Sequence, residues 1–139
     1  MKVLYDTNIV MDIVLDRKPY SESVIRLFTM TERGTVTGVL CATTLTTVHY
    51  LVGRELGMIR AHHILRVLLS LFEVAPVNRA VLESAWNMKW KDFDDGVLHE
   101  AARESGVPII ITRDRAGFSE ATLSIMSPDQ FLDMRESLN

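Results

Sequence analysis

Three consecutive isoleucines, Ile109-Ile110-Ile111, limit the possible folds of this chain more than any other segment. β-branched side chains favour strands, and strand side chains alternate between two faces, so an unbroken apolar run indicates burial on both. Strands of this kind occur almost only in parallel sheets that helices cover on both sides. We therefore expect residues 108–112 to form a buried strand of an α/β protein.

The rest of the chain alternates between strand-like and helix-like segments. Further strands are expected at Lys2–Tyr5, Val36–Cys41, Phe72–Val77 and Leu123–Met126. Apolar spacing and cap residues predict helices at 9–14, 21–33, 43–55, 60–71, 78–86 and 92–105, with Thr43 or Thr44 capping the third, and a last helix from Pro128. This alternation indicates βαβ units. We predict one domain over residues 1–139, a three-layer α/β/α sandwich with a central parallel sheet.

Composition and net charge indicate the class of protein and the cellular compartment that the sequence suits. The chain has 139 residues, of which 47% are hydrophobic and 24% charged, as in ordinary globular proteins. Its net charge of −3 argues against binding nucleic acid by bulk electrostatics, but it allows an acidic site with basic residues nearby. The single cysteine, Cys41, cannot form an internal disulfide and is expected to be a buried, inert thiol. Without a leader pattern or a membrane-length apolar run, we expect a cytoplasmic protein with no membrane partner.

Acidic residues follow two of the predicted strands and open one helix. Asp6 follows the first strand and Asp114 follows the isoleucine strand, so both should lie at the edge where parallel strands end. Asp92 and Asp95 are three residues apart at a helix start and share one helical face. Carboxylates brought this close repel each other unless protons or cations neutralise them. Oxygen-rich sites of this kind suit Mg²⁺ or Mn²⁺.

Each acid also has a purely structural explanation. Asp6 and Asp92 can cap the helices that follow them, because a carboxylate oxygen accepts the free backbone N–H groups there. Asp95 can be a first-turn acid that the helix dipole favours, and Asp114 can be a turn residue. Their joint placement at one edge of the sheet favours a site.

The same segments resemble the PIN-domain family, nucleases that include the toxins of VapBC-type toxin–antitoxin systems. The resemblance spans nearly the whole chain and rests on five pieces in the expected order: residues 4–10, Asp92-Phe93-Asp94-Asp95, residues 110–114, Phe118 and residues 127–132. It implies hydrolysis of RNA phosphodiester bonds in an acidic cleft that binds Mg²⁺ or Mn²⁺. It also implies a homodimer and a protein antitoxin as a partner, which suits the apolar helices expected near the N-terminus.

The resemblance also assigns roles to individual residues. It implies that Asp6, Asp95 and Asp114 are metal ligands and catalytic residues, and that Asp92 is an additional acid of this kind. It implies that the supporting residues, which orient ligands or waters by hydrogen bonds, are Thr7, Asn8 and Thr112. Arg113 and Arg115 flank Asp114 and are candidates for contacts with RNA phosphates.

Two positions depart from the family pattern. Thr47 stands where the family usually carries an acid on the helix after the second strand, and Gly117 stands where many members have an acid before the phenylalanine. On that helix His49 faces away and Glu55 lies too far along the axis to substitute for the missing acid. A catalytically weakened or inactive module that acts by binding metal, RNA or protein is therefore the alternative function.

Two other acidic α/β classes fit the residues less well. Phosphoryl transfer through an aspartyl intermediate needs a second acid two residues after the nucleophile, and Asn8 occupies that position. A receiver-like domain needs paired acids early in the chain, where Asp6 stands alone.

The remaining notable side chains have structural explanations. We expect Trp86 and Trp90, four apart on one helix face, to pack in the core rather than stack on bases. We expect His62 and His63 at the surface, because adjacent helical residues point in different directions.

Overall fold

The centre of the molecule is a five-stranded, fully parallel sheet. The computed structural model describes residues 1–138. Its strands are β1 (Lys2–Tyr5), β2 (Thr37–Cys41), β3 (Glu73–Ala75), β4 (Ile109–Ile111) and β5 (Ser124–Met126). They lie in the order β3-β2-β1-β4-β5, so the chain order reverses between β1 and β4. All five predicted strands are confirmed, and this reversal is the place where open α/β sheets bind their ligands.

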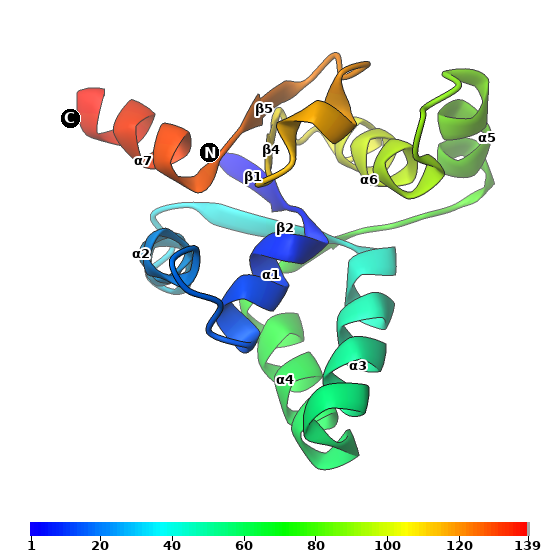
Figure 1. Cartoon of the computed structure of the whole chain (residues 1–139). Coiled ribbons are helices and arrows are strands. Elements are labelled where there is room, and N and C mark those ends of the chain that lie inside the picture. The colour runs from blue at the N-terminus through cyan, green and yellow to red at the C-terminus, as the bar shows by residue number, and fades with distance from the viewer. Residues whose placement is uncertain (139) are drawn as a thin grey trace.

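Helices cover both faces of the sheet. They are α1 (Thr7–Val14), α2 (Ser21–Glu32), α3 (Ala42–Leu56), α4 (Met58–Leu71), α5 (Arg79–Asn87), α6 (Phe93–Glu104) and α7 (Pro128–Ser137), with a short 3₁₀ helix, η1 (Arg115–Phe118). Helices α1 to α4 lie on one side of the sheet, and α5 and α6 lie on the other (Figure 1). The predicted three-layer α/β/α sandwich is confirmed. Within residues 1–138, no helix is both long enough and apolar enough to cross a bilayer.

One predicted helix cap is wrong. Helix α3 begins at Ala42, with Cys41 at the cap position in an extended conformation, rather than at Thr43 or Thr44. The chain passes from β2 into α3 without a loop, so both threonines fall inside the first turn. Cys41 itself is buried, as expected.

The strand side chains alternate between two hydrophobic cores. Val3 and Tyr5 of β1 face the core under α1 to α4, whereas Leu4 faces the core under α5 and α6. Strand β4 follows the same rule, with Ile109 and Ile111 on the first side and Ile110 on the second. All three isoleucines are buried, which confirms the prediction from their β-branched run.

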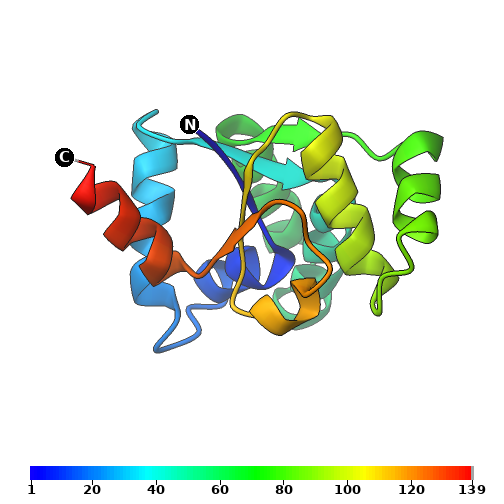
Figure 2. The same cartoon turned by 90° about the horizontal axis from the view of Figure 1, so that it is seen from above.

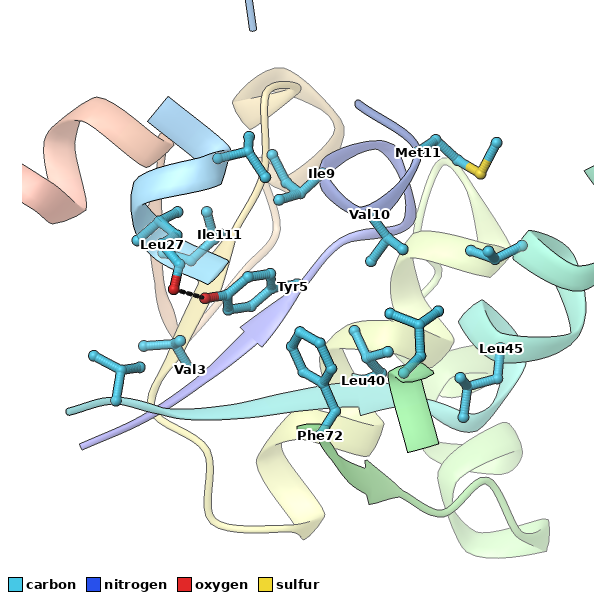
Figure 3. Close-up of a cluster of buried hydrophobic side chains, with 14 of the residues drawn as sticks. Val3, Tyr5, Ile9, Val10, Met11, Leu27, Leu40, Leu45, Phe72 and Ile111 are labelled. Carbon is cyan, nitrogen blue, oxygen red and sulfur yellow. Dashed lines mark hydrogen bonds between the residues drawn. The ribbon is translucent and has the colours of Figure 1, made fainter. Parts of the chain in front are cut away.

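Tyr5 anchors the first core to the sheet (Figure 3). Its hydroxyl donates a hydrogen bond of 3.1 Å to the carbonyl oxygen of Leu27 on α2 and lies 2.7 Å from the hydroxyl of Thr31. Its ring packs edge-on against Phe28 and Phe72, at centroid distances of 5.5 and 5.2 Å. The polar end of a buried tyrosine is thus satisfied while its ring fills the core.

Trp90 plays the corresponding part in the second core. A Cβ atom at Gly96 would lie 2.6 Å from Cγ of Trp90, so glycine is what lets the indole lie against the first turn of α6. The indole also meets the rings of His99 and Phe118, at 4.9 and 5.9 Å. The core-packing prediction is therefore right for Trp90.

The same prediction is wrong for Trp86, whose side chain is 74% exposed. Helix α5 ends at Asn87, and Lys89 turns the chain with a φ of 54°. The two tryptophans consequently do not lie on one continuous helix, and four-residue spacing no longer places them on one face.

A buried ion pair holds the loop after β4 against α1. Asp12 is fully buried and accepts two hydrogen bonds from Arg113, of 2.6 Å from Nε and 3.0 Å from Nη2. The Arg113 guanidinium also lies 4.0 Å from the centre of the Tyr20 ring.

Seen from above, η1 and the first turn of α6 lie on the side of the sheet toward which β1 runs (Figure 2).

We expect Arg113→Met to lower the free energy of unfolding by about 2 to 3 kcal/mol, because it removes both hydrogen bonds to the buried Asp12 carboxylate and leaves it only a looser ion pair with Arg17, at 3.7 Å. Urea unfolding followed by circular dichroism measures the change. Arg79→Met is the matched control, since its ion pair with Glu83 is largely exposed, and we expect no measurable loss there. Equal losses in the two variants would contradict a stabilising role for the buried pair.

Candidate active site

The carboxylate of Asp6 lies at the end of β1, at the point where the strand order reverses. Asp6 is buried and caps α1, with its Oδ1 accepting a hydrogen bond of 2.7 Å from the backbone N–H of Thr7. Its Oδ2 accepts a second bond of 2.7 Å from the hydroxyl of Thr112. Burial raises the pKa of Asp6, and the nearby Asp114 carboxylate adds to the rise, while both hydrogen bonds oppose it.

Thr112 connects this carboxylate to the next acid. Its Oγ1 donates to Asp6 and accepts a hydrogen bond of 3.0 Å from the backbone N–H of Asp114. Asp114 in turn caps η1, because its Oδ1 accepts a bond of 3.2 Å from the N–H of Gly117. One threonine therefore sets the position of two acids that come from opposite ends of the chain.

The first turn of α6 brings in the other two acids. Asp92 caps the helix through Oδ1, which accepts bonds of 2.9 Å from the N–H of Asp94 and 3.3 Å from that of Asp95. Asp95 is half-buried, and burial raises its pKa to about 7, with further contributions from the charges of Asp6, Asp92 and Asp114. The structure thus brings all four predicted acids into one electrostatic group.

Three of these acids have the structural role of a helix cap, and this role is compatible with a functional one. Asp6, Asp92 and Asp114 each cap a helix start, as the structural alternative expected. In Asp92 and Asp114 the cap uses only Oδ1, so Oδ2 is not committed to it. A cap fixes the orientation of a carboxylate and leaves its second oxygen available to a ligand.

The donor set fits a hard divalent cation. All four side chains offer oxygen, and their mutual repulsion favours a positive ion between them. Asn8, in the first turn of α1, adds a buried side-chain oxygen that has no hydrogen-bond partner among residues 1–138. Across this same range, no three His, Cys, Asp or Glu side chains lie close enough together to hold one ion. Charge repulsion acts over longer distances than coordination bonds, so the acids influence each other without forming a closed cage.

Gly117 allows two of these acids to approach each other. A Cβ atom at this position would lie 2.8 Å from Oδ2 of Asp95 and 3.0 Å from Oδ2 of Asp114. An acid at position 117 would therefore occupy the space into which these carboxylates project. The missing side chain at Gly117 therefore leaves room for these two carboxylates.

The first turns of α3 approach Asp6 through a threonine that the sequence pattern did not single out. Thr44 is buried, and its hydroxyl lies 2.9 Å from that of Thr7. Thr47, one turn further along α3, is exposed. The position of the missing family acid is thus open to solvent, beside the helix turn that contacts Thr7.

His99 is a buried residue of α6 that the sequence pattern did not indicate. It is fully buried in α6, and its Nε2 accepts hydrogen bonds from the backbone N–H groups of Thr122 and Leu123, at 3.1 and 3.3 Å. Its Nδ1 therefore carries the proton and donates to Glu100 over 2.7 Å. An isolated histidine on an apolar helix face gives no signal of this kind in sequence.

The other three histidines lie on α3 and α4. His62 and His63 are exposed on α4, as predicted, and His49 is half-buried on α3. An unpredicted hydrogen bond of 2.8 Å joins Nε2 of His49 to Nδ1 of His62.

Basic side chains border the acidic group. A cleft of about 420 Å³ opens between the start of α6 and η1, with Lys91 and Asp92 on one side and Gly117 on the other. Within residues 1–138, Lys91 and Arg115 have no ion-pair partner, whereas Arg113 is held by Asp12. Of the two arginines proposed to contact RNA, Arg115 is the one without a protein carboxylate to bind.

The raised pKa of Asp95 predicts how stability depends on pH. An acid whose folded-state pKa exceeds its unfolded value costs stability once it ionises, so this cost grows as the pH rises from about 4 to about 7. We expect Asp95→Asn to raise the melting temperature in EDTA by a few degrees at pH 8 and by less at pH 5. Thermal unfolding at both pH values measures this difference. An equal rise in melting temperature at pH 5 and pH 8 would contradict the raised pKa of Asp95.

Known proteins share the fold of this chain. Residues 2–116 match the PIN domain family. The chain is 22% identical to Ribonuclease VapC1 of Aquifex aeolicus, over 99% of this chain and 97% of that protein. The structure of VapBC2 from Rickettsia felis, bound to a promoter DNA fragment, has a TM-score of 0.69 at 13% identity, covering 91% of this chain and 98% of that one.

A second solved structure comes from Mycobacterium tuberculosis. VapC20, described as a Sarcin-Ricin loop cleaving toxin, has a TM-score of 0.64 at 16% identity and covers 78% of this chain and 86% of that one. These structural likenesses concern the fold, and the match to residues 2–116 covers well over half of the sequence. This chain belongs to the PIN domain family.

Proposed function

We propose that this protein is a Mg²⁺- or Mn²⁺-dependent endoribonuclease that hydrolyses RNA phosphodiester bonds. The observation that carries the proposal is the acidic group at Asp95, whose pKa is raised to about 7 by burial and by the charges of Asp6, Asp92 and Asp114. Repulsion between carboxylates lowers stability, so groups of this kind persist mainly where the charges serve a function. Perturbed pKa values accordingly cluster at functional sites. Membership of the PIN domain family and the likeness to a protein named Ribonuclease VapC1 support the same reaction.

In this proposal Asp6, Asp95 and Asp114 would hold the ion once their side chains draw closer around it, and Asp92 would be an additional acid beside them. A bound divalent ion supplies positive charge to the scissile phosphate and lowers the pKa of water. The backbone N–H of Thr7 and the hydroxyl of Thr112 keep the Asp6 carboxylate in one orientation. Asn8 offers a further buried oxygen near the start of α1, which suits a supporting role.

The substrate's phosphates meet the basic rim. Lys91 lines the acidic cleft and Arg115 begins η1, next to Asp114. Both are exposed and have no ion-pair partner in the described part of the chain, so each can neutralise a phosphate. Arg113 contributes chiefly by holding the loop that carries Asp114 against α1.

We expect Asp6→Asn to reduce cleavage of a labelled single-stranded RNA by at least about 100-fold, because even partners of metal ligands cost that much when changed. EDTA should abolish wild-type cleavage, and Mg²⁺ or Mn²⁺ should restore it. Asp133→Asn, an exposed acid on α7, is the matched control and should cleave like the wild type. RNA cleavage that survives both Asp6→Asn and EDTA would refute the proposed function.

The alternative is a catalytically weakened or inactive module that acts by binding. The observation that favours it is the exposed Thr47 on α3, at the position where the family usually has an acid. Calorimetric titration with Mn²⁺ separates the two functions in part, since a nuclease must bind the ion. Binding without RNA cleavage would favour the weakened module.

Restoring the missing acid tests how far Thr47 limits activity. We expect Thr47→Glu to raise the Mn²⁺ affinity and the rate of RNA cleavage by about tenfold, because it adds a carboxylate on the helix that contacts Thr7. Thr46→Glu adds the same charge at the neighbouring exposed position and should change neither. The same gain in both variants would show a general charge effect instead.

We further propose that the protein is the toxin of a VapBC-type pair, with an antitoxin protein as its partner, and that it acts on RNA in the cytoplasm as a homodimer. The likeness to the VapBC2 structure supports this role. An exposed apolar surface on α4, which includes Met58, Ile59 and Leu69, suits a protein interface.

A further inference from the structure

A second cleft lies beside the acidic one, on the connection between α5 and α6. It has a volume of about 430 Å³ and is lined mainly by Trp86, Lys89, Trp90 and Phe93. Trp86 is 74% exposed and Phe93 is 44% exposed, although both are large apolar side chains. Within residues 1–138 neither ring pairs with another aromatic ring. Two exposed aromatic rings thus border one cleft, and neither has an aromatic partner among the described residues.

The connection between α5 and α6 separates this cleft from the acidic one. Lys91 and Asp92 line the acidic cleft, while Lys89, Trp90 and Phe93 line the aromatic one. Because these residues are consecutive, the two clefts lie on either side of a single short loop. A chain molecule bound at the acids has to cross this loop to place its next unit against the aromatic rings.

The charges around the aromatic cleft suit a phosphate backbone. Lys89 and Lys91 are exposed, and neither has an ion-pair partner within the described residues. Lys89 adopts a φ of 54°, a left-handed conformation that glycine or asparagine adopts at lower cost. The Lys89 side chain lies at the rim of a cleft that aromatic rings line. A partner that interacted only through apolar contact would gain nothing from these two charges.

We propose that Trp86 and Phe93, with Lys89 at their rim, form a stacking site for an unpaired base of the RNA strand whose phosphate lies at the acids. This inference rests on the proposed function and names its substrate as single-stranded or looped RNA. Every base has an aromatic face, so the site accepts different bases, and the lysines contact the phosphates between the two clefts. Bases in a duplex are already stacked and do not enter.

Binding of RNA in EDTA, where no metal-dependent cleavage occurs, tests the proposal. The probes are a six-nucleotide single-stranded RNA, a duplex RNA of the same length, and an abasic strand that keeps the phosphates. We expect Trp86→Ala to weaken binding of the single strand by about 5- to 150-fold. Binding of the duplex and of the abasic strand should not change. Tyr50→Ala, which removes an exposed aromatic ring on α3, is the matched control and should bind all three like the wild type.

Two further variants separate stacking from folding and from charge. Trp86→Phe keeps an aromatic face and should retain affinity within about twofold, while most of the quenching of tryptophan fluorescence by RNA is lost, since the remaining Trp90 lines the cleft but is only 7% exposed. Lys89→Asn removes the charge with a residue that tolerates the left-handed conformation. It should weaken binding of the single strand and the abasic strand alike.

The outcomes distinguish this inference from the proposed function. Wild-type cleavage with unchanged single-strand binding in Trp86→Ala would overturn the stacking site and leave the ribonuclease standing; the aromatic surface would then suit a protein partner. Base-dependent binding that requires Trp86, without any cleavage in Mg²⁺ or Mn²⁺, would support the stacking site and refute the enzyme. An equal loss for single strand and duplex would also overturn the inference.

Discussion

The hydrogen bond from Thr112 to Asp6 is the contact on which the rest of the site depends. β1 and β4 pair in parallel register, with Tyr5 opposite Ile111, and the N–H of Asp6 extends this pairing to the carbonyl of Ile111. Asp6 and Thr112 therefore leave the sheet side by side, 106 residues apart in sequence. Because Thr112 also accepts a bond from Asp114, one hydroxyl group sets the geometry of the central acids.

The acids repel each other, so the fold has to hold them together. On one side, the ring of Trp90 packs against the rings of His99 and Phe118 and fixes the first turn of α6 to η1. On the other, the buried pair of Asp12 and Arg113 holds the loop after β4 to α1. Burial and this repulsion both raise the pKa of Asp95, and the two contacts offset the loss of stability that its ionisation brings. A neighbouring cation would relieve that cost, which links stability to the proposed chemistry.

Much of this arrangement could be predicted from local patterns. The isoleucine run predicted burial on both faces, and the alternation of elements predicted the parallel sheet, because hydrophobic periodicity reflects burial directly. The placement of Asp6 and Asp114 followed from the rule that parallel strands end at one edge. Asp92 and Asp95 were correctly placed at a helix start. The structure shows the capping role of Asp92 and Asp114, and since the cap uses one oxygen, it leaves the other for the proposed site role.

The contacts between distant segments could not be predicted in this way. Trp86 and Trp90 have helical spacing, yet the left-handed turn at Lys89 separates them into an exposed ring and a core ring. Arg113 was considered for RNA contact, but the fully buried Asp12 holds its guanidinium. Gly117 differs from the family pattern, and only the positions of two carboxylates show what its missing side chain permits.

The sequence by itself therefore determined the order of elements, the parallel sheet and the edge at which the acids lie, because these follow from burial and from chain direction. The tertiary structure decided which side chains meet: Thr112 with Asp6, Arg113 with Asp12, and Trp90 with Gly96. It also decided that Trp86 faces solvent next to the acidic cleft. Such pairings depend on distances between segments far apart in the chain, and periodicity carries no information about them.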